Sequence, residues 1–591
     1  MKTFRKKVGF HLFSAFLVCL LIVTIWGQFV DLAEANFFPI STPQPAFVIK
    51  SDGSVDPSTA PIHRDGNSYT FTDNIVDYTV AVERDNIVLD GNGYTLRGNG
   101  DSTGLFLKNR NGVTVKNMDV SGFQYGIRLF AEDFMNMNSS SNSLLDNLLT
   151  GNEYGIYISY SSGNVLRNNQ MNKNTNNFWI KGGYVSDTET GYLDDIGASN
   201  MVDGKPIIYW VNEQDKVAPS NAGYVAFVRC TNMTAQNLSL SNNAQGILVV
   251  TTASAYLTKN YITNSDNGIY LFKSKNVVVA DNHIANNSEG IHGHNSSDNR
   301  ISSNNITNNK SGVYFTSTSV NNIISGNIIA ENTVDGLNLW GSSNTSLYEN
   351  TISFNNETGI NLFDSRNNKI TANTIANNTG SGIKFWYDAS ENIVFENNIT
   401  NNNIGILIND SFDNVIIRNT VKDNTEWGMR FESTQNNNVI YQNSFINNRP
   451  AGDELQVSVT GVGIMDPKPG GGNVWDNGTT GNYWSDYKTR YPNATEIGSS
   501  GTGSTSFVIN ENNIDRHPLM GFAIIPEFSS WIILLALLII VTLVVVAIRK
   551  KGDCPAGYGT KRNLGSGAVW VLSELLQTGN SSPLFFSPSI L

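Results

Sequence analysis

A repeat of about 23 residues runs through most of the chain and limits what it can fold into. A glycine followed by an apolar residue recurs at steps of 22 to 24 residues, at Gly246, Gly268, Gly290, Gly312, Gly336, Gly359, Gly382, Gly405 and Gly428. A series of asparagines keeps the same period, at Asn260, Asn282, Asn304, Asn327, Asn350, Asn373, Asn397, Asn419 and Asn443. Repetition at this period is typical of a solenoid whose repeats pack on their neighbours.

The apolar segments after these glycines are short and alternate with polar residues, as in GIYLF, GINLF, GIKFW and GILIN. Alternation indicates strands rather than helices. Asn, Ser, Asp and Gly, which favour turns, bound each segment. The pattern predicts an all-β fold, a right-handed parallel β-helix with about 23 residues per coil. We expect Gly or Asn where a turn requires a positive φ, and asparagine side chains that hydrogen-bond from coil to coil.

The N-terminus has the features of an export signal. Basic residues precede a largely apolar run from Val8 to Val30, and Ala33-Glu34-Ala35 matches a cleavage site. We therefore predict a signal peptide over residues 1–35, with an uncleaved membrane anchor as the alternative.

A second apolar run, residues 531–548, is followed by the basic cluster Arg549-Lys550-Lys551. Its length suffices for a transmembrane helix, and the basic cluster favours a cytoplasmic tail over residues 549–591. Residues 524–530 would be the linker to this helix. The prediction is a single-pass protein of the cell membrane whose large N-terminal part is extracellular.

Charge and cysteine content exclude some classes of function. The chain has 51 acidic and 39 basic side chains, a formal net charge of −12, and no basic stripe, so we do not expect nucleic acid as a partner. Cys230 is the only cysteine between the predicted signal and the predicted transmembrane helix, which excludes an intrachain disulfide there.

Four segments in order resemble NosD-type periplasmic β-helix proteins. They are DNIVLDGNGYTLRG at 85–98, VDGKPIIYWVNEQD at 202–215, GYVAFVRCTNMTAQNLSLSNNAQGI at 223–247, and GNYWSDY with NNIDRHPLM at 481–487 and 512–520. The resemblance covers residues 45–522. It implies a β-helix of the carbohydrate-binding and sugar-hydrolysing group, whose namesake assists copper-site maturation of a periplasmic reductase. Anchored relatives are common as prokaryotic, often archaeal, surface proteins.

The period also predicts the internal organisation. Residues 36–449 would form the β-helix, and residues 182–222, which break the period, would leave the stack as an excursion. Residues 450–523, rich in Gly and aromatic residues, would cap the C-terminal end, because an open coil exposes a sheet edge.

An aromatic stripe is the main candidate for ligand binding. The first and third residues after each repeat glycine should face the core, and the second and fourth should face outward. The outward positions include Phe272, Tyr314, Trp340, Phe363 and Trp386. Contiguous exposed aromatic side chains usually contact something, and aromatic rings stack well on sugar rings. The stripe predicts binding of a polysaccharide or surface glycan; packing under a loop and contact with a protein are the alternatives.

His292 and His294 occupy the same two outward positions of one coil. An exposed histidine pair two residues apart on a strand could bind a transition metal at the surface. Two ligands fall short of the three or four that zinc sites use, so two ordinary outward residues are the favoured interpretation.

An enzyme is the second class of function. Asp364, Asp388 and Asp410 follow the outward positions of three successive coils, and Lys384 lies on the same face. Carboxylates on adjacent coils could approach the separation that glycosidases use. Acidic residues at turns are usually only solvated. We therefore favour a non-catalytic, membrane-anchored carbohydrate-binding or adhesion protein. A polysaccharide hydrolase or lyase, a structural envelope protein and a NosD-like metal-site maturation factor remain alternatives.

Overall fold

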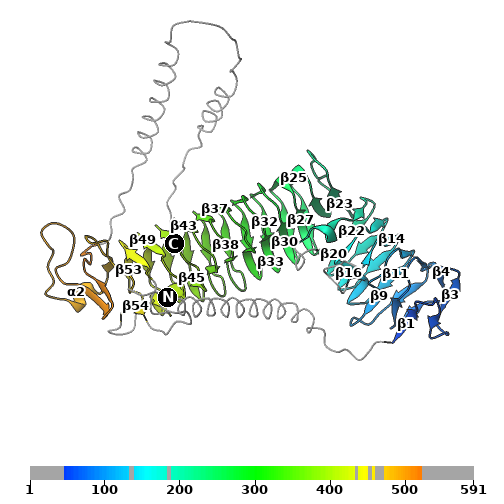
Figure 1. Ribbon diagram of the computed structural model, residues 1–591, viewed down its shortest axis with the longest axis horizontal. Helices are drawn as coiled ribbons and strands as arrows, with labels where there is room; N and C mark the ends of the chain where they lie inside the picture. The colour runs from blue at the N-terminus through cyan, green and yellow to red at the C-terminus, as the bar shows by residue number, and fades with distance from the viewer. Residues whose placement is uncertain are drawn as a thin grey trace, which may run out of the picture. The chain divides into compact units, whose positions relative to one another are not determined.

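The short apolar segments form strands that stack in parallel from coil to coil. The structure is a computed structural model that describes residues 45–131, 139–182, 188–432, 437–449, 455–459 and 472–521. Figure 1 shows these residues as successive coils of strands, each stacked on the next. The chain is thus an all-β parallel β-helix, as the repeat predicts. The predicted signal peptide, linker, transmembrane helix and tail lie outside the described residues. Within the described ranges, none of the helices could cross a membrane.

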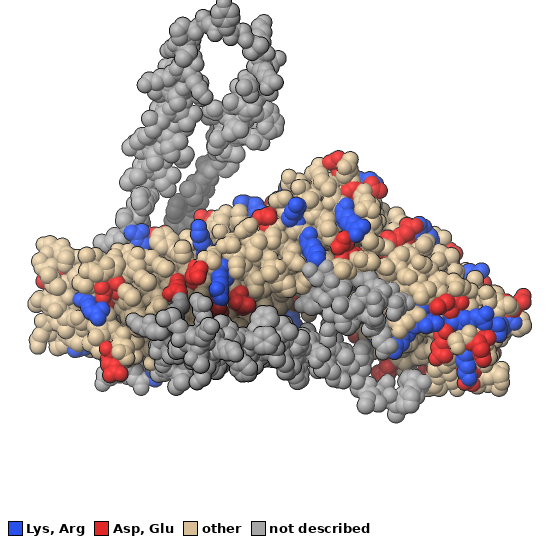
Figure 2. Space-filling model, viewed as in Figure 1, with Lys and Arg blue, Asp and Glu red and all other residues tan. Residues whose placement is uncertain are grey.

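The coils form two stacks. The first stack has one sheet from β1 (Ala46–Ile49) to β20 (Asn176–Lys181), a second from β3 (Ile62–Asp65) to β21 (Asp195–Ile196), and a third from β5 (Ile75–Val76) to β22 (Met201–Val202). Figure 2 shows that charged side chains of both signs are interspersed over the described residues of one face, most densely around these N-terminal coils.

The second stack carries the candidate sites. One of its sheets, here called the long-strand sheet, consists of β23 (Lys205–Val211), β24 (Tyr224–Val228), β27 (Gln245–Val250), β30 (Asn267–Phe272), β33 (Glu289–His294), β36 (Ser311–Thr316), β39 (Leu337–Trp340), β42 (Ile360–Phe363), β45 (Ser381–Trp386), β48 (Ile404–Asn409), β51 (Trp427–Phe431) and β54 (Val457–Val459). The other two sheets run from β25 (Thr231–Gln236) to β52 (Val439–Tyr441) and from β26 (Ser239–Ser241) to β55 (Tyr483–Trp484).

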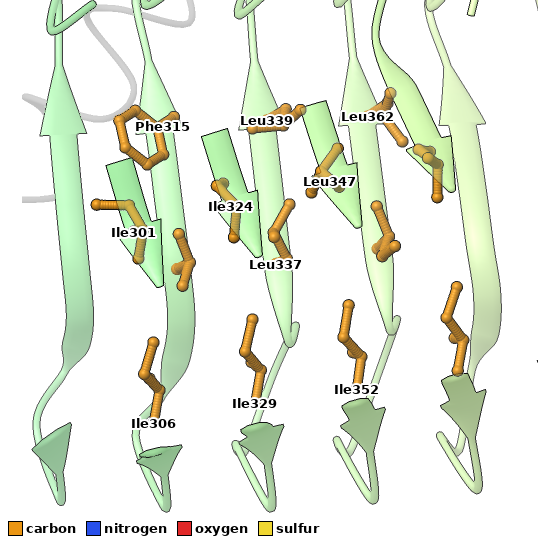
Figure 3. Close-up of a cluster of buried hydrophobic side chains, with 14 of the residues drawn as sticks. Ile301, Ile306, Phe315, Ile324, Ile329, Leu337, Leu339, Leu347, Ile352 and Leu362 are labelled. Atoms are coloured by element: carbon orange, nitrogen blue, oxygen red, sulfur yellow. The ribbon is translucent and has the colours of Figure 1, made fainter. Parts of the chain in front are cut away.

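The core lies between the three sheets of each coil. Figure 3 shows aliphatic side chains of successive coils, such as Ile324, Leu339 and Ile352, directed into the interior, one rung above the next. These side chains are fully buried. The first and third residues after each repeat glycine face this core, as predicted. An aromatic residue at the second or fourth position is therefore not needed to complete it.

The repeat glycines are required for close approach rather than for a positive φ. A Cβ at Gly290 would lie only 2.4 Å from the carbonyl oxygen of Gly312 on the next coil. The positive φ values at the turns belong mainly to other residues, such as Asn264 (φ 53°) and Asn286 (φ 57°). The expectation that Gly or Asn supplies the positive φ at turns is confirmed at residues such as Asn264 and Gly341, whereas the repeat glycines are needed for close approach.

The asparagines of the repeat form ladders along the axis, as predicted. Asn373 shows the pattern: its Oδ1 accepts hydrogen bonds from the backbone N–H and the Nδ2 of Asn350 at 3.0 and 2.9 Å. Its own Nδ2 donates to the carbonyl of Leu347 (3.0 Å) and to Asn397 Oδ1 (2.9 Å). Asn373 therefore satisfies two buried backbone groups of the preceding coil and links to the ladder asparagine of the next coil.

Residues 188–222 join the two stacks instead of leaving them. Strands β21 and β22 add the last rung of the first stack, and β22 then pairs antiparallel with β23, which begins the long-strand sheet. The rings of Phe178, in the first stack, and Tyr224, in the second, lie 5.2 Å apart, edge to face. Consequently the outer faces of β24, β27 and β30 are buried at the junction rather than exposed.

The C-terminal end of the second stack is covered by residues 472–521. They contain α2 (Tyr487–Arg490), β56 (Phe507–Asn510) and β57 (Asn513–Asp515). Trp484 stacks on Phe445 of the last coil at 4.7 Å and on Phe507 at 4.2 Å. This arrangement shields the apolar core at the end of the stack.

Candidate functional site

Three aromatic residues of the predicted stripe form a continuous row on the outer face, in which Trp340 and Trp386 are exposed and Phe363 is half-buried. Trp340, Phe363 and Trp386 are register partners on β39, β42 and β45. The ring centroids of Trp340 and Phe363 lie 4.6 Å apart, and those of Phe363 and Trp386 lie 5.3 Å apart. Trp340 is 38% exposed and Trp386 37% exposed. Because their strands already fill the core with other side chains, these rings face outward from a complete fold.

Tyr387 widens this row. It directly follows Trp386 and is 36% exposed. Its ring stacks on Phe363 at 5.2 Å with an interplanar angle of 6°. We call Trp340, Phe363, Trp386 and Tyr387 the aromatic stripe from here on.

A polar row runs beside the stripe on the same three strands. Asn338, Asn361 and Lys384 are register partners two residues before Trp340, Phe363 and Trp386. Side chains two apart on a strand share a face, so this row lies on the outer face with the stripe. The ammonium of Lys384 lies 4.6 Å from the centroid of the Trp386 ring, a cation–π contact.

Asp335 fixes the two amides of this row. Its Oδ2 accepts hydrogen bonds from Nδ2 of Asn338 (3.4 Å) and Nδ2 of Asn361 (3.2 Å), while its Oδ1 accepts from the backbone N–H of Thr358 (3.0 Å). Burial raises the pKa of the Asp335 carboxyl, and the bonds from Thr358 and Asn361 offset only part of that rise. Asp335 thus orients the polar edge of the stripe.

The other two residues of the predicted stripe lie nearer the junction. Phe272 is fully buried: its ring lies 5.7 Å from Tyr192 and stacks on His294 at 5.3 Å. The prediction of an exposed Phe272 is therefore wrong, because Tyr192, in the connection between the stacks, packs over it. Tyr314 is half-buried, and its ring lies 5.2 Å from that of His292.

The two histidines are buried as well, not exposed as predicted. His292 Nδ1 pairs with Glu289 Oε2 at 2.7 Å, and His294 Nδ1 lies 3.0 Å from Thr316 Oγ1. Burial by itself would raise the pKa of Glu289, but the positive charges of His292 and of nearby lysines outweigh it and hold that pKa below the usual range. The pair belongs to the packing of the outer face beside the junction.

The site does not fit a transition metal. No three residues among His, Cys, Asp and Glu come together to hold a metal ion in the described part of the chain. Glu289 and Thr316 already occupy ring nitrogens of the two histidines. The thiol of Cys230 is buried and lies 3.3 Å from the carbonyl oxygens of Trp210 and Val228. We assign no metal chemistry to these residues.

The three aspartates of the enzyme hypothesis are turn residues. Asp364, Asp388 and Asp410 have φ values of 45°, 62° and 44°, the left-handed region that aspartate tolerates at turns. Asp388 forms an ion pair with Arg366 and accepts a hydrogen bond from Ser390 Oγ at 2.8 Å. Asp410 is buried. Lys384 makes a cation–π contact with Trp386, and of the three carboxylates that of Asp388 is held by Arg366 and Ser390.

Sequence reasoning missed Asp335, Tyr387 and Glu289. Asp335 and Glu289 directly precede a repeat glycine, at a position that is polar in five successive coils: Gln245, Asn267, Glu289, Ser311 and Asp335. That polar row was the signal from which Glu289 and Asp335 could have been found. Tyr387 lies at a turn with a φ of 50°, where Asn or Asp is usual. A tyrosine at such a turn position was the signal that could have drawn attention to it.

Comparisons with known proteins agree with the fold. The family model described as "Periplasmic copper-binding protein (NosD)" matches residues 63–191 and 331–489, and the model "Right handed beta helix region" matches residues 216–352. None of the curated proteins matches the chain.

Several solved β-helix structures are similar at low identity. The A-module of the mannuronan C-5 epimerase AlgE6 of Azotobacter vinelandii is 13% identical, with 66% of this chain and 91% of that chain covered and a TM-score of 0.31. The periplasmic alginate epimerase AlgG is 13% identical over 69% and 80%, with a TM-score of 0.29. XylC in complex with xylose is 12% identical over 48% and 57%, with a TM-score of 0.27. We transfer no property of these proteins to this chain. The parallel coils identify the chain as a right-handed β-helix protein, and its sequence resembles the NosD family over the two matched stretches.

Proposed function

We propose that this protein is a non-catalytic carbohydrate-binding protein of the cell surface, and that the aromatic stripe is its binding surface. The observation that carries the proposal is the exposure of Trp340 and Trp386 in register on the outside of a complete core. Exposing large aromatic rings to water is unfavourable, so a row of them is typical of a contact surface. The apolar faces of sugar rings suit such a surface, and the amides and ammonium beside it suit sugar hydroxyls.

The proposal includes the location. The signal peptide predicted over residues 1–35 and the helix predicted over residues 531–548 would export the β-helix and anchor it to the cell membrane. The stripe would then meet polysaccharides or glycans outside the cell. A catalytic role is disfavoured by the engagement of Asp388 with Arg366 and by the turn positions of Asp364 and Asp410.

Removing either tryptophan should weaken glycan binding. We expect Trp340→Ala and Trp386→Ala each to lower the affinity about tenfold or more, because an aromatic residue that anchors a ligand typically contributes more than about 1.4 kcal/mol. Binding of the full-length protein would be measured by affinity electrophoresis in gels that contain β-1,4-glucan, xylan, mannan, alginate or polygalacturonate.

A matched control is Tyr256→Ala. Tyr256 is 47% exposed on β28 (Ala253–Thr258), which belongs to a different sheet. This variant should migrate as the wild type does. The free energy of unfolding should change by less than about 0.5 kcal/mol in Tyr256→Ala. It should change by about 1 kcal/mol or less in the two tryptophan variants, whose rings lie outside the core. Equal retardation of the wild type and both tryptophan variants would contradict the stripe as the binding surface.

A further inference from the structure

The direction of the stripe determines what kind of glycan it can hold. Trp340, Phe363 and Trp386 are partners on neighbouring parallel strands, so the stripe runs along the axis of the β-helix and across the strands. Neighbouring strands lie about 4.8 Å apart. That spacing is close to the length of one sugar unit in an extended chain, so one coil corresponds to one unit.

The stripe has two defined ends. Before Trp340, the register partner is Thr316, which is buried and lies against His294. After Trp386, the register partner is Asn409, whose Nδ2 donates to Glu432 Oε2 at 3.0 Å. Aromatic contact is therefore limited to the three coils between these polar partners.

The rings of the stripe do not share one plane. The interplanar angle is 45° between Trp340 and Phe363 and 84° between Phe363 and Trp386. A flat crystalline polysaccharide surface presents its sugar rings in one plane and would contact one indole at a time. A single flexible chain can turn successive sugar units to follow the rings.

The polar row follows the same direction. Asn338, Asn361 and Lys384 advance by one coil each, beside Trp340, Phe363 and Trp386. Asp335 holds the amides of both asparagines, on two successive coils. Each of the three strands thus contributes one outward ring and one polar side chain, and Tyr387 adds a fourth ring that stacks on Phe363. This regular advance suits a repeating linear ligand.

We propose that the ligand is a single linear polysaccharide chain, extended along the β-helix axis, with roughly three consecutive sugar units over the stripe, one for each coil. This inference rests on the proposed function and specifies the class of glycan that the same surface recognises. Compact branched glycans and flat crystalline surfaces do not fit it.

The test is the dependence of affinity on chain length. The polymer that retards the full-length protein in the gels would be cut into oligomers of one to six units, and each would be titrated by calorimetry. Affinity should rise at least tenfold from the single sugar to the trimer and change less than about threefold from trimer to hexamer, because roughly three coils carry rings. In Trp340→Ala, which shortens the stripe at one end, the trimer should bind no more than about twofold tighter than the dimer.

Other outcomes would overturn the inference. A single sugar that binds as tightly as the trimer would indicate an isolated pocket, and affinity that climbs steadily to the hexamer would indicate a longer site. Retardation by branched polymers alone would exclude an extended chain. In each of these cases glycan binding, and hence the proposed function, would stand. Free migration in every gel would contradict both.

Discussion

Replacing Asp194 with asparagine is expected to stabilise the protein at pH 8 and to give no such gain at pH 4. Asp194 lies at the end of an asparagine ladder of the first stack, where its Oδ1 accepts hydrogen bonds from the backbone N–H and the Nδ2 of Asn164 at 2.8 and 2.9 Å. Its Oδ2 is buried and has no partner within the described residues. Burial raises the pKa of this carboxyl to about 7.

The sign of the pH effect follows from that shift. A carboxyl whose pKa is higher in the folded than in the unfolded protein stabilises the fold only while it is protonated. The stabilisation is present below pH 3.8, the ordinary value, and is lost as the pH rises to about 7. At about 1.4 kcal/mol per pKa unit the loss is of the order of 4 kcal/mol. Asparagine keeps the acceptor oxygen without the charge. Its unpaired amide N–H group lowers the stability of the variant by about 1–3 kcal/mol, which offsets part of the gain.

The measurement is the unfolding midpoint of wild type and Asp194→Asn between pH 4 and pH 8. These two opposing effects should raise the free energy of unfolding of the variant by about 2 kcal/mol at pH 8. Burial also raises the pKa of Asp515 to about 6, so this residue lowers the stability of both proteins as the pH rises. Its effect cancels when the two proteins are compared.

Asp195→Asn is the matched control. Asp195 is exposed and pairs with Arg167 at the surface, so its loss should change stability by less than about 1 kcal/mol at either pH. An Asp194→Asn variant that is destabilised equally at pH 4 and pH 8 would contradict the assignment of a buried carboxylate without a counter-charge.

Asn373→Ala is expected to destabilise the second stack by at least about 3 kcal/mol. The alanine removes the acceptor for both donors of Asn350 and the donor to the carbonyl of Leu347. These groups are buried among neighbouring coils, where each unpaired polar group costs about 1–3 kcal/mol. The urea midpoint of the full-length protein measures the effect.

Asn356→Ala is the control that distinguishes the loss of a ladder asparagine from the loss of any asparagine. Asn356 directly follows a ladder residue of the same coil, Asn355, but its own side chain is exposed. We expect its replacement to change the free energy of unfolding by less than about 0.5 kcal/mol. If both alanine variants shifted the midpoint equally, the ladder would not be what holds neighbouring coils together.

Periodic features of the fold could be predicted from the sequence. The strands, the inward rows and the coil-to-coil asparagine contacts each depend on residues one period apart, so the repeat itself contains the information. The same register placed Trp340, Phe363 and Trp386 in one row on the outer face.

Features that depend on contact between the two stacks could not be predicted. Tyr192 packs over Phe272, 80 positions later in the sequence, and no local pattern indicates that contact. The burial of Phe272 follows from this contact, and His294 in turn stacks on the buried Phe272 ring. The close approach of the repeat glycines was likewise hidden, because it is a distance between coils.

The most direct test of glycan binding by the aromatic stripe is the migration of the full-length wild-type protein through gels that contain the five polysaccharides, followed by staining for intact polymer. Retardation in at least one gel, with the polymer uncut, is the result that non-catalytic binding predicts. A cleared zone around a retarded band would make the protein an enzyme. Free migration in every gel would contradict binding and leave the β-helix as a structural component of the cell envelope.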